Sequence, residues 1–148
     1  MATSSPPLGC TNFKLRQLTR RVSQHYDHHL ALAGIKTTQY SLLSHIAKLG
    51  PLTPGELARR MTLDASTLTR NLQPLVAAGW VVVGEGVNAR SRLLTLTEAG
   101  REVRQTAQRH WKNAQLELNG LLGPAMVAEL HGLLDQALAA FEPKTSDE

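Results

Sequence analysis

Small hydroxyl side chains and one arginine gather in a single short segment, residues 66–73. Ser66, Thr67 and Thr69 can each donate and accept hydrogen bonds, and Arg70 can hold a guanine or a phosphate through two parallel bonds. Groups of this kind contact base edges and phosphates in a DNA groove. An ordinary solvated helix face carries more Lys and Glu, so this cluster favours DNA contact over a plain polar surface.

A second basic cluster follows on a loop between two apolar segments. The letters VNARSR place Arg90 and Arg92 near the tip of that loop. An arginine on a thin loop can enter the minor groove, where the potential is most negative; the alternative is an exposed turn with incidental arginines. The predicted DNA contacts are Thr53, Ser66, Thr67, Thr69, Arg70, Gln73, Arg90 and Arg92.

The hydroxyl cluster lies on the second of two short predicted helices. Thr53, Pro54 and Glu56 form the pattern of a capping box with proline at the first helical position, which begins the first helix. Asp64 caps the second helix, which we expect to end near Ala78. Its predicted inward stripe consists of Leu68, Leu72, Leu75 and Val76, and we expect Pro74 to kink or loosen its last turn.

Two strands, at 80–83 and 92–96, flank the basic loop, and Thr97 caps a long helix after them. The order is therefore helix, turn, helix, hairpin and long helix. This order predicts a mostly α fold with a small β-hairpin wing, a winged helix-turn-helix.

The flanking helices carry apolar stripes longer than so small a lobe can cover. The stripe positions recur at steps of three and four. Another helix, capped by Thr37 or Thr38, follows the first stripe. The stripes are Leu15, Leu18, Val22, Tyr26 and Leu30; Val103, Ala107, Trp111, Ala114, Leu118 and Leu121; and Val127, Leu130, Leu134, Ala137 and Phe141. Exposed stripes of this length are a liability, so we expect the N- and C-terminal helices to form the dimerisation region of a homodimer.

Composition narrows the class of protein. The 148 residues carry a net charge of +4, distributed as +5 over residues 1–52, +2 over 53–104 and −3 over 105–148. A basic front suits a polyanionic partner. We find no sequence pattern of a membrane span or a signal peptide, so we expect a cytoplasmic protein without membrane association. We also find no nucleophile–base pair and no phosphate-binding loop, so we expect a protein that is not an enzyme and has no cofactor.

The stretch LARRMTLDASTLTRNLQPLVAAGWVVVGEGVNARSRLLTLTEAGR resembles the winged helix of the MarR family of bacterial transcriptional regulators. DASTLTR and LTEAGR carry the resemblance most strongly. It implies a homodimer that binds a pseudo-palindromic double-stranded DNA operator, with the recognition helix in the major groove and Arg90 at the wing tip. Many family wings read Asp-x-Arg, whereas this chain has Asn88 in place of the aspartate.

In outline the resemblance covers one domain, residues 12–142. It implies a winged helix-turn-helix lobe at 37–104 and dimerisation helices at 12–36 and 105–142. Residues 1–11 and 143–148 are predicted to be a flexible N-terminus and a flexible tail.

The resemblance also implies a small-molecule effector, an aromatic or phenolic anion held between the dimer helices and the winged lobe. The candidate ligand-binding residues are Arg16, Arg20, Tyr26, His29, Tyr40, His45 and Trp111. The alternative for the aromatic members is that they only fill the core or an interface.

Cys10 and the histidine pair His25 and His29 could have other roles, in redox sensing and in metal binding. Cys10 is the only cysteine, and some relatives sense oxidants with an N-terminal cysteine near two tyrosines, although their cysteine position corresponds to Leu15 here. His25 and His29 have a chelating spacing on a helix but lack an evident third ligand, so no metal site is predicted.

The function predicted is a homodimeric, sequence-specific repressor released from its operator by a small ligand. One alternative is a thiol-based redox-sensing repressor that uses Cys10. Another is a winged-helix module that binds proteins and not DNA.

Overall fold

The computed structural model describes residues 8–85, 88 and 92–143. Its helices and strands confirm a mostly α chain with one antiparallel β-hairpin. The elements are α1 (Thr11–Leu30), the 3-10 turn η1 (Ala31–Ala33), α2 (Thr37–Leu49), α3 (Pro54–Met61), α4 (Ala65–Ala77), β1 (Val81–Val83), β2 (Leu94–Leu96), α5 (Glu98–Leu122) and α6 (Pro124–Ala140).

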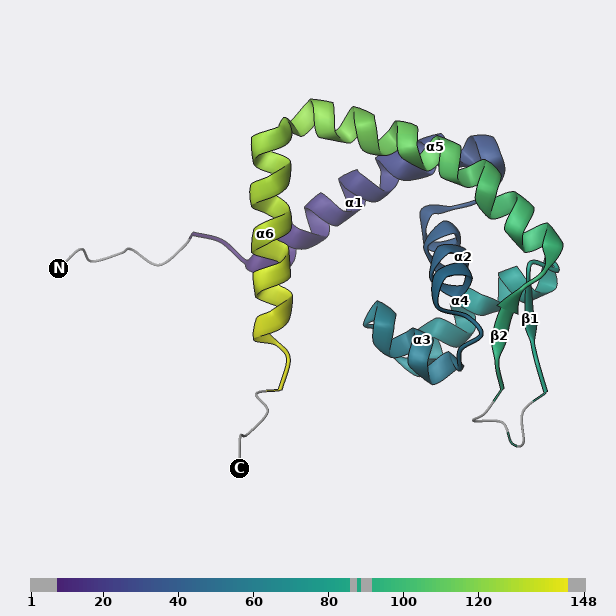
Figure 1. Ribbon diagram of the computed structural model, residues 1–148. Helices are drawn as coiled ribbons and strands as arrows, with labels where there is room; N and C mark the ends of the chain where they lie inside the picture. Colours follow the sequence, from purple (N-terminus) through teal and green to yellow (C-terminus); the bar gives the residue numbers. More distant parts are fainter. Residues whose placement is uncertain (1–7, 86–87, 89–91, 144–148) are drawn as a thin grey trace.

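The long helix α5 joins two dissimilar ends of the molecule (Figure 1). A lobe of α2, α3, α4 and the hairpin lies at the beginning of α5, and α6 turns sharply away from its other end, while α1 packs along α5. The division expected at residues 104 and 105 falls inside α5, which is one continuous helix. The lobe and the terminal helices are therefore connected through a shared rigid element.

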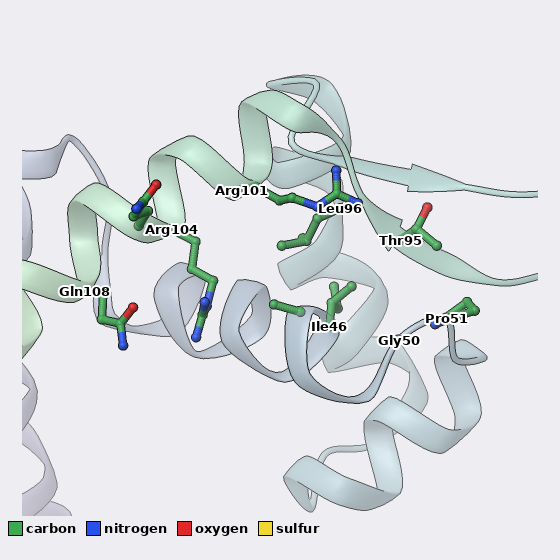
Figure 2. Close-up of a pocket in the computed structure, with 10 residues that line it drawn as sticks. Ile46, Gly50, Pro51, Thr95, Leu96, Arg101, Arg104 and Gln108 are labelled. Carbon is green, nitrogen blue, oxygen red and sulfur yellow. The ribbon is translucent and has the colours of Figure 1, made fainter.

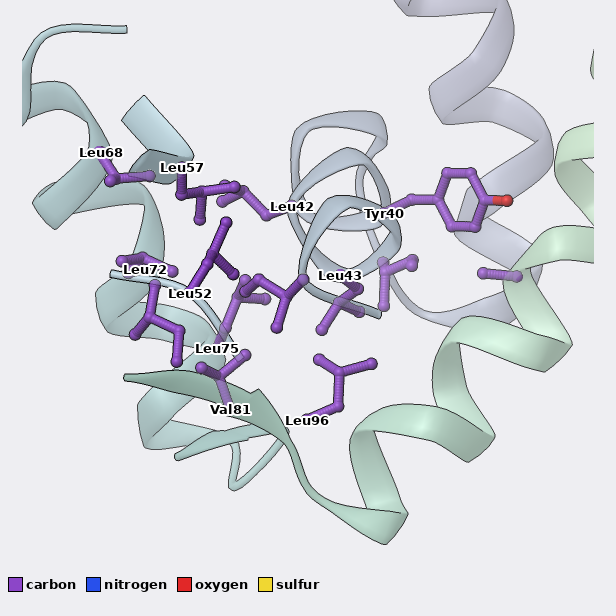
Figure 3. Close-up of a cluster of buried hydrophobic side chains, with 14 of the residues drawn as sticks. Tyr40, Leu42, Leu43, Leu52, Leu57, Leu68, Leu72, Leu75, Val81 and Leu96 are labelled. Atoms are coloured by element: carbon purple, nitrogen blue, oxygen red, sulfur yellow. The ribbon is translucent and has the colours of Figure 1, made fainter. Parts of the chain in front are cut away.

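The hydrophobic core lies in the lobe, between α2, α3, α4 and the two strands (Figure 3). Its fully buried side chains come from every element of the lobe: Leu42, Leu43, Ile46, Leu57, Leu68, Leu75, Val81 and Leu94. Full burial of one such side chain contributes roughly 1.5–3 kcal/mol. The lobe thus has a complete core within a single chain.

One detail of α4 differs from expectation. Val76 is 41% exposed, because Leu68, Leu72 and Leu75 already occupy the inward face at helical spacing. As predicted, the helix continues past Pro74, and the Pro74 carbonyl accepts a hydrogen bond from the Ala78 N–H at 3.0 Å.

Hydrogen bonds at Thr97 and a close approach at Gly100 hold the end of α4, the hairpin and α5 together. The Thr97 hydroxyl donates to the Gly79 carbonyl at 2.6 Å and accepts from the Gly100 N–H at 3.0 Å. A Cβ at Gly100 would lie 2.1 Å from the Trp80 carbonyl oxygen, so the position requires glycine. The segment LTEAGR, residues 96–101, therefore forms the joint between the lobe and the long helix α5.

The beginning of α2 also differs from expectation. Lys36 is the N-cap residue, not Thr37 or Thr38. The N–H of Thr37 donates to a carboxylate oxygen of Asp27 on α1 at 2.7 Å, so the cap comes from a neighbouring helix. The strands are shorter than predicted, and Leu52 forms an isolated antiparallel bridge with Leu94 beside them.

The terminal helices leave part of their apolar stripes, and several further apolar side chains, exposed. None of the residues of α6, all of which are described, is buried in the single chain. The exposed large apolar side chains of this region include Phe13, Leu15, Leu18, Leu121, Met126, Leu133, Leu134, Leu138 and Phe141. Trp111, which belongs to the second predicted stripe, packs instead against the lobe core beside Tyr40.

Candidate nucleic-acid interface and effector cavity

Asp64 organises the first turn of α4. One of its carboxylate oxygens accepts the Thr67 N–H at 2.7 Å and the Ser66 hydroxyl at 2.8 Å. The backbone bond from Thr67, followed by the side-chain bonds from Ser66 and Thr67, holds the pKa of the Asp64 carboxyl below its usual value. The Asp64 side chain therefore stays ionised and fixes the first turn of α4.

The outer face of α4 is polar and exposed. Ser66, Thr69, Arg70 and Gln73 lie opposite the buried leucines, at spacings that put them on one side of the helix. The Thr69 hydroxyl donates to the Ala65 carbonyl at 2.9 Å, so its oxygen can still accept a bond from a partner. Arg70 Nη2 lies 3.4 Å from the Thr67 hydroxyl oxygen, a weak contact that leaves most of its donors available.

Thr53 has a different place from the other predicted DNA contacts. It is the N-cap of α3, and its hydroxyl accepts the Glu56 N–H at 3.2 Å while its own N–H donates to Glu56 Oε2 at 2.9 Å. The capping box predicted from the sequence is thus present. Thr53 sets the beginning of α3, and its contact with DNA stays a prediction.

The hairpin projects from the lobe with Val81 opposite Leu96 and Val83 opposite Leu94. Arg92 is exposed at the return strand. Arg90, the predicted wing-tip contact, lies outside the described residues, as do the neighbouring positions 89 and 91.

A cavity of about 490 Å³ lies where α1, α2 and α5 meet. Four of the seven predicted ligand-binding residues line it: Tyr26, Tyr40, His45 and Trp111. The other three, Arg16, Arg20 and His29, lie elsewhere: the two arginines are exposed on the first half of α1, and His29 pairs with Glu117. The two cations of the cavity are Lys48 and Arg104, which sequence reasoning missed.

The cavity walls combine aromatic surface with hydrogen-bonding groups. Tyr40 and Trp111 stack with ring centroids 6.0 Å apart and planes 29° apart. Arg104 Nε donates to the Ser44 hydroxyl at 3.3 Å, and the buried hydroxyl of Thr37 has no hydrogen-bond partner among the described residues. Lys48 lies two helical turns after Tyr40 on α2, so both residues lie on the same side of the helix. This spacing could have predicted Lys48 as a further cavity residue.

Tyr26 has a partner already. Its hydroxyl donates to the Gln115 side-chain oxygen on α5, and burial raises the pKa of the phenol. Tyr26 therefore presents a neutral ring to the cavity at neutral pH.

A second hollow of about 490 Å³ lies on the other side of Arg104, between the end of α2, β2 and the first turns of α5 (Figure 2). Ile46, Leu96, Arg101 and Gln108 are among its walls. It has cations but lacks the stacked aromatic wall of the first cavity. The two hollows share Arg104 and Gln108.

Residues 33–91 match the family model described as MarR family. The multiple antibiotic resistance protein MarR of Salmonella typhimurium is 32% identical over 134 residues, which cover 89% of this chain and 91% of that protein. The chain belongs to the MarR family.

Two solved structures of this family contain DNA. The M. tuberculosis transcriptional regulator MosR in complex with DNA superposes with a TM-score of 0.76 at 32% identity, covering 90% of this chain and 100% of that one. A MarR mutant from E. coli with operator DNA has a TM-score of 0.75 at 25% identity, covering 86% and 92%. This chain therefore has the fold and family of DNA-binding transcriptional regulators.

Cys10 lies apart from the tyrosines of this MarR-family chain. It is exposed and precedes the first turn of α1, whereas Tyr26 is sixteen residues further along. At about 1.5 Å per residue, the helix separates them by about 24 Å. The cysteine–tyrosine grouping of the redox alternative is therefore not formed within one chain. Among the described residues, we find no helix with the length and apolar content that a membrane span requires.

Proposed function

We propose that the chain is a homodimeric repressor that reads a pseudo-palindromic operator with α4. The observation that carries this proposal is the exposed face of Ser66, Thr69, Arg70 and Gln73 on a helix whose other face is fixed in the core. A helix supported in this way can enter the major groove with its first turns at the base edges. Arg92, which is exposed at the return strand, and Arg90, the predicted wing-tip residue, would then contact the flanking minor groove.

The face of α4 also separates this proposal from the protein-binding alternative. A docking surface for another protein concentrates aromatic and aliphatic anchors in its centre. The α4 face instead presents hydroxyls, an amide and a guanidinium, which match phosphates and base edges. We therefore favour DNA as the partner.

We infer that two chains associate because a single chain leaves large apolar side chains of α6 and of the first half of α1 exposed. Leu133 and Leu138 are each 59% exposed, and Phe141 is 89% exposed. Pairing these helices with a second copy would bury the stripes and would hold two copies of α4 at a fixed separation. An operator with two half-sites one helical turn, about 34 Å, apart matches such a pair.

The effector we propose is a small aromatic anion bound in the cavity lined by Tyr40 and Trp111. The stacked rings give an apolar wall for an aromatic ring, and Lys48 and Arg104 give positive charge for a carboxylate or phenolate. The Thr37 hydroxyl, which is without a hydrogen-bond partner in the part of the chain that the structure describes, could supply a further hydrogen bond. Since α5 connects this cavity to both the lobe and the terminal helices, a bound anion can favour one separation of the two α4 helices over another.

Fluorescence anisotropy with labelled DNA from upstream of the protein's own coding sequence tests both the DNA binding and the effector response. We expect tight, salt-dependent binding that benzoate and its hydroxylated relatives weaken. Lys48→Met should reduce the effector response while leaving DNA binding without effector unchanged. Arg101→Met, which removes a cation from the second hollow only, is the matched control and should keep the response. If Arg101→Met lost the effector response as fully as Lys48→Met, the effector would not be bound in the aromatic cavity. Absence of specific DNA binding would overturn the proposed function.

A further inference from the structure

Three side chains with metal-binding atoms meet where α1 packs on α5. One ligand atom from each of His25, His29 and Glu117 lies within 4.8 Å of the other two. The histidines are one turn apart on α1, and Glu117 comes from α5. None of these residues lines the aromatic cavity described above. The cluster therefore has a place in the fold separate from the proposed effector site.

A hydrogen bond to the backbone of α5 holds the ring of His25. Its Nε2 lies 2.8 Å from the Ala114 carbonyl oxygen, to which it donates when the ring is neutral. A ring in that tautomer carries its lone pair on Nδ1. Histidines that bind metals usually donate their other ring N–H to a carbonyl or carboxylate, which fixes both tautomer and orientation. The Ala114 carbonyl would have this role if His25 bound the ion through Nδ1.

His29 and Glu117 are already in contact, with Nε2 and Oε2 2.7 Å apart. The side chain of His29 is 14% exposed, whereas that of Glu117 is 64% exposed. The histidine is thus held by its surroundings, while the carboxylate can move to close around an ion. A divalent cation would take the place of the proton that this pair shares, and that proton would pass to solvent.

We propose that His25, His29 and Glu117 bind one divalent transition-metal ion, with Zn²⁺ as the best match. Two imidazoles and one carboxylate suit zinc and its neighbours, whereas calcium and magnesium prefer oxygen ligands alone. Three protein ligands leave a fourth tetrahedral position for water. The ion would link α1 to α5 and so stabilise the region that we propose forms the dimer.

The helical spacing of the two histidines was visible in the sequence, but the third ligand was not. Glu117 is 88 residues from His29 along the chain, and only the packing of α5 on α1 brings it to the site. A carboxylate facing an i, i+4 histidine pair across a helix interface distinguishes this cluster from paired surface histidines.

Competition between the full-length chain, free of any polyhistidine tag, and a chromophoric chelator measures zinc affinity directly. We expect one Zn²⁺ per chain and a visible Co²⁺ absorption band typical of four-coordinate geometry. Glu117→Gln and His29→Gln should each weaken zinc binding by about tenfold or more, since even residues that only support the ligands commonly cost that much. His28→Gln is the matched control, because His28 is exposed on the same helix and is outside the cluster.

Thermal unfolding gives a second measurement that does not involve DNA. Zinc should raise the melting temperature of the wild type and of His28→Gln but not that of Glu117→Gln. Unchanged zinc affinity in Glu117→Gln and His29→Gln, or an equal loss in His28→Gln, would overturn the proposal. A substoichiometric ion without the Co²⁺ band would overturn it as well. Because no readout depends on an operator, failure here is distinguishable from failure of the proposed function.

Discussion

The lobe and the terminal helices solve the burial of apolar side chains in opposite ways. In the lobe, Leu43 and Leu57 are 0% exposed, and the polar residues of α4 are left outside. In the terminal helices, Leu121 and Phe141 are 79% and 89% exposed, and α6 buries no residue at all. The lobe is complete in one chain and presents the polar face that we propose reads DNA, whereas the terminal helices leave apolar side chains exposed that we propose a second copy covers.

The largest expected effect is on association of two chains through the terminal helices. Leu133→Asp places a charge in the apolar face of α6, and the two-fold repetition of a homodimer places it there twice. We expect the loss of at least about 3 kcal/mol of association free energy, or roughly 100-fold in the dimer dissociation constant. Sedimentation equilibrium measures this constant.

Ala128→Asp makes the same change on the opposite side of α6 and should leave the dimer intact. If Leu133→Asp still sediments as the wild-type dimer, the uncovered face of α6 is not the interface.

The next effect concerns the face of α4. Arg70→Ala should cost about 1–3 kcal/mol of operator binding, because it removes a guanidinium that reads a base or holds a phosphate. Arg109→Ala removes an exposed arginine of α5 and should change operator affinity little. A fluorescence titration in which the two variants behave alike would remove Arg70 from the reading face.

A substitution at the joint between the two regions should have an effect of similar size, on the stability of the fold. Gly100→Ala should destabilise the fold by about 1–3 kcal/mol, because the new methyl group would meet the Trp80 carbonyl 2.1 Å away. Gly120→Ala is the control in the same helix, with nothing within 4 Å of the new methyl group, and should stabilise the helix by about 0.5–1 kcal/mol. Chemical denaturation gives both values, and equal effects would contradict the close approach.

The smallest effect is the pH dependence of the α4 cap. The pKa of Asp64 is lowered in the folded chain by its hydrogen bonds, the Thr67 N–H first, so the charged cap stabilises the fold above the usual carboxyl pKa of 3.8. That contribution is lost as pH falls through the lowered folded-state pKa. Asp64→Asn keeps a capping oxygen but does not titrate. The melting temperature of wild type relative to Asp64→Asn should therefore decline only in acid, and a difference independent of pH would contradict this assignment.

Local signals in the sequence were sufficient for the lobe and insufficient for the sites between helices. The caps at Thr53, Asp64 and Thr97 and the leucine stripe of α4 depend on neighbours within one or two turns, so they could be predicted. Val76 could not be distinguished from its stripe, because its burial depends on the exact rotation of α4 against α2.

The sites that bring distant segments together show the same limit. Tyr26, Tyr40, His45 and Trp111 were expected near an effector, but Lys48 and Arg104 emerge only when α2 and α5 are packed. Glu117 was missing from the histidine pair for the same reason. Arg16 and Arg20 were predicted from charge alone, and charge does not say which side of a helix faces a cavity.

The most direct test of two paired α4 helices is the spacing dependence of operator binding. A duplex carrying both half-sites should bind two chains, and insertion of five base pairs between them turns one half-site to the opposite side of the DNA. Anisotropy titration combined with sedimentation of the complex measures affinity and stoichiometry together. We predict that the insertion reduces affinity by about 100-fold or more, to that of a single half-site. Equal affinity for both spacings, or one chain per full site, would contradict the account.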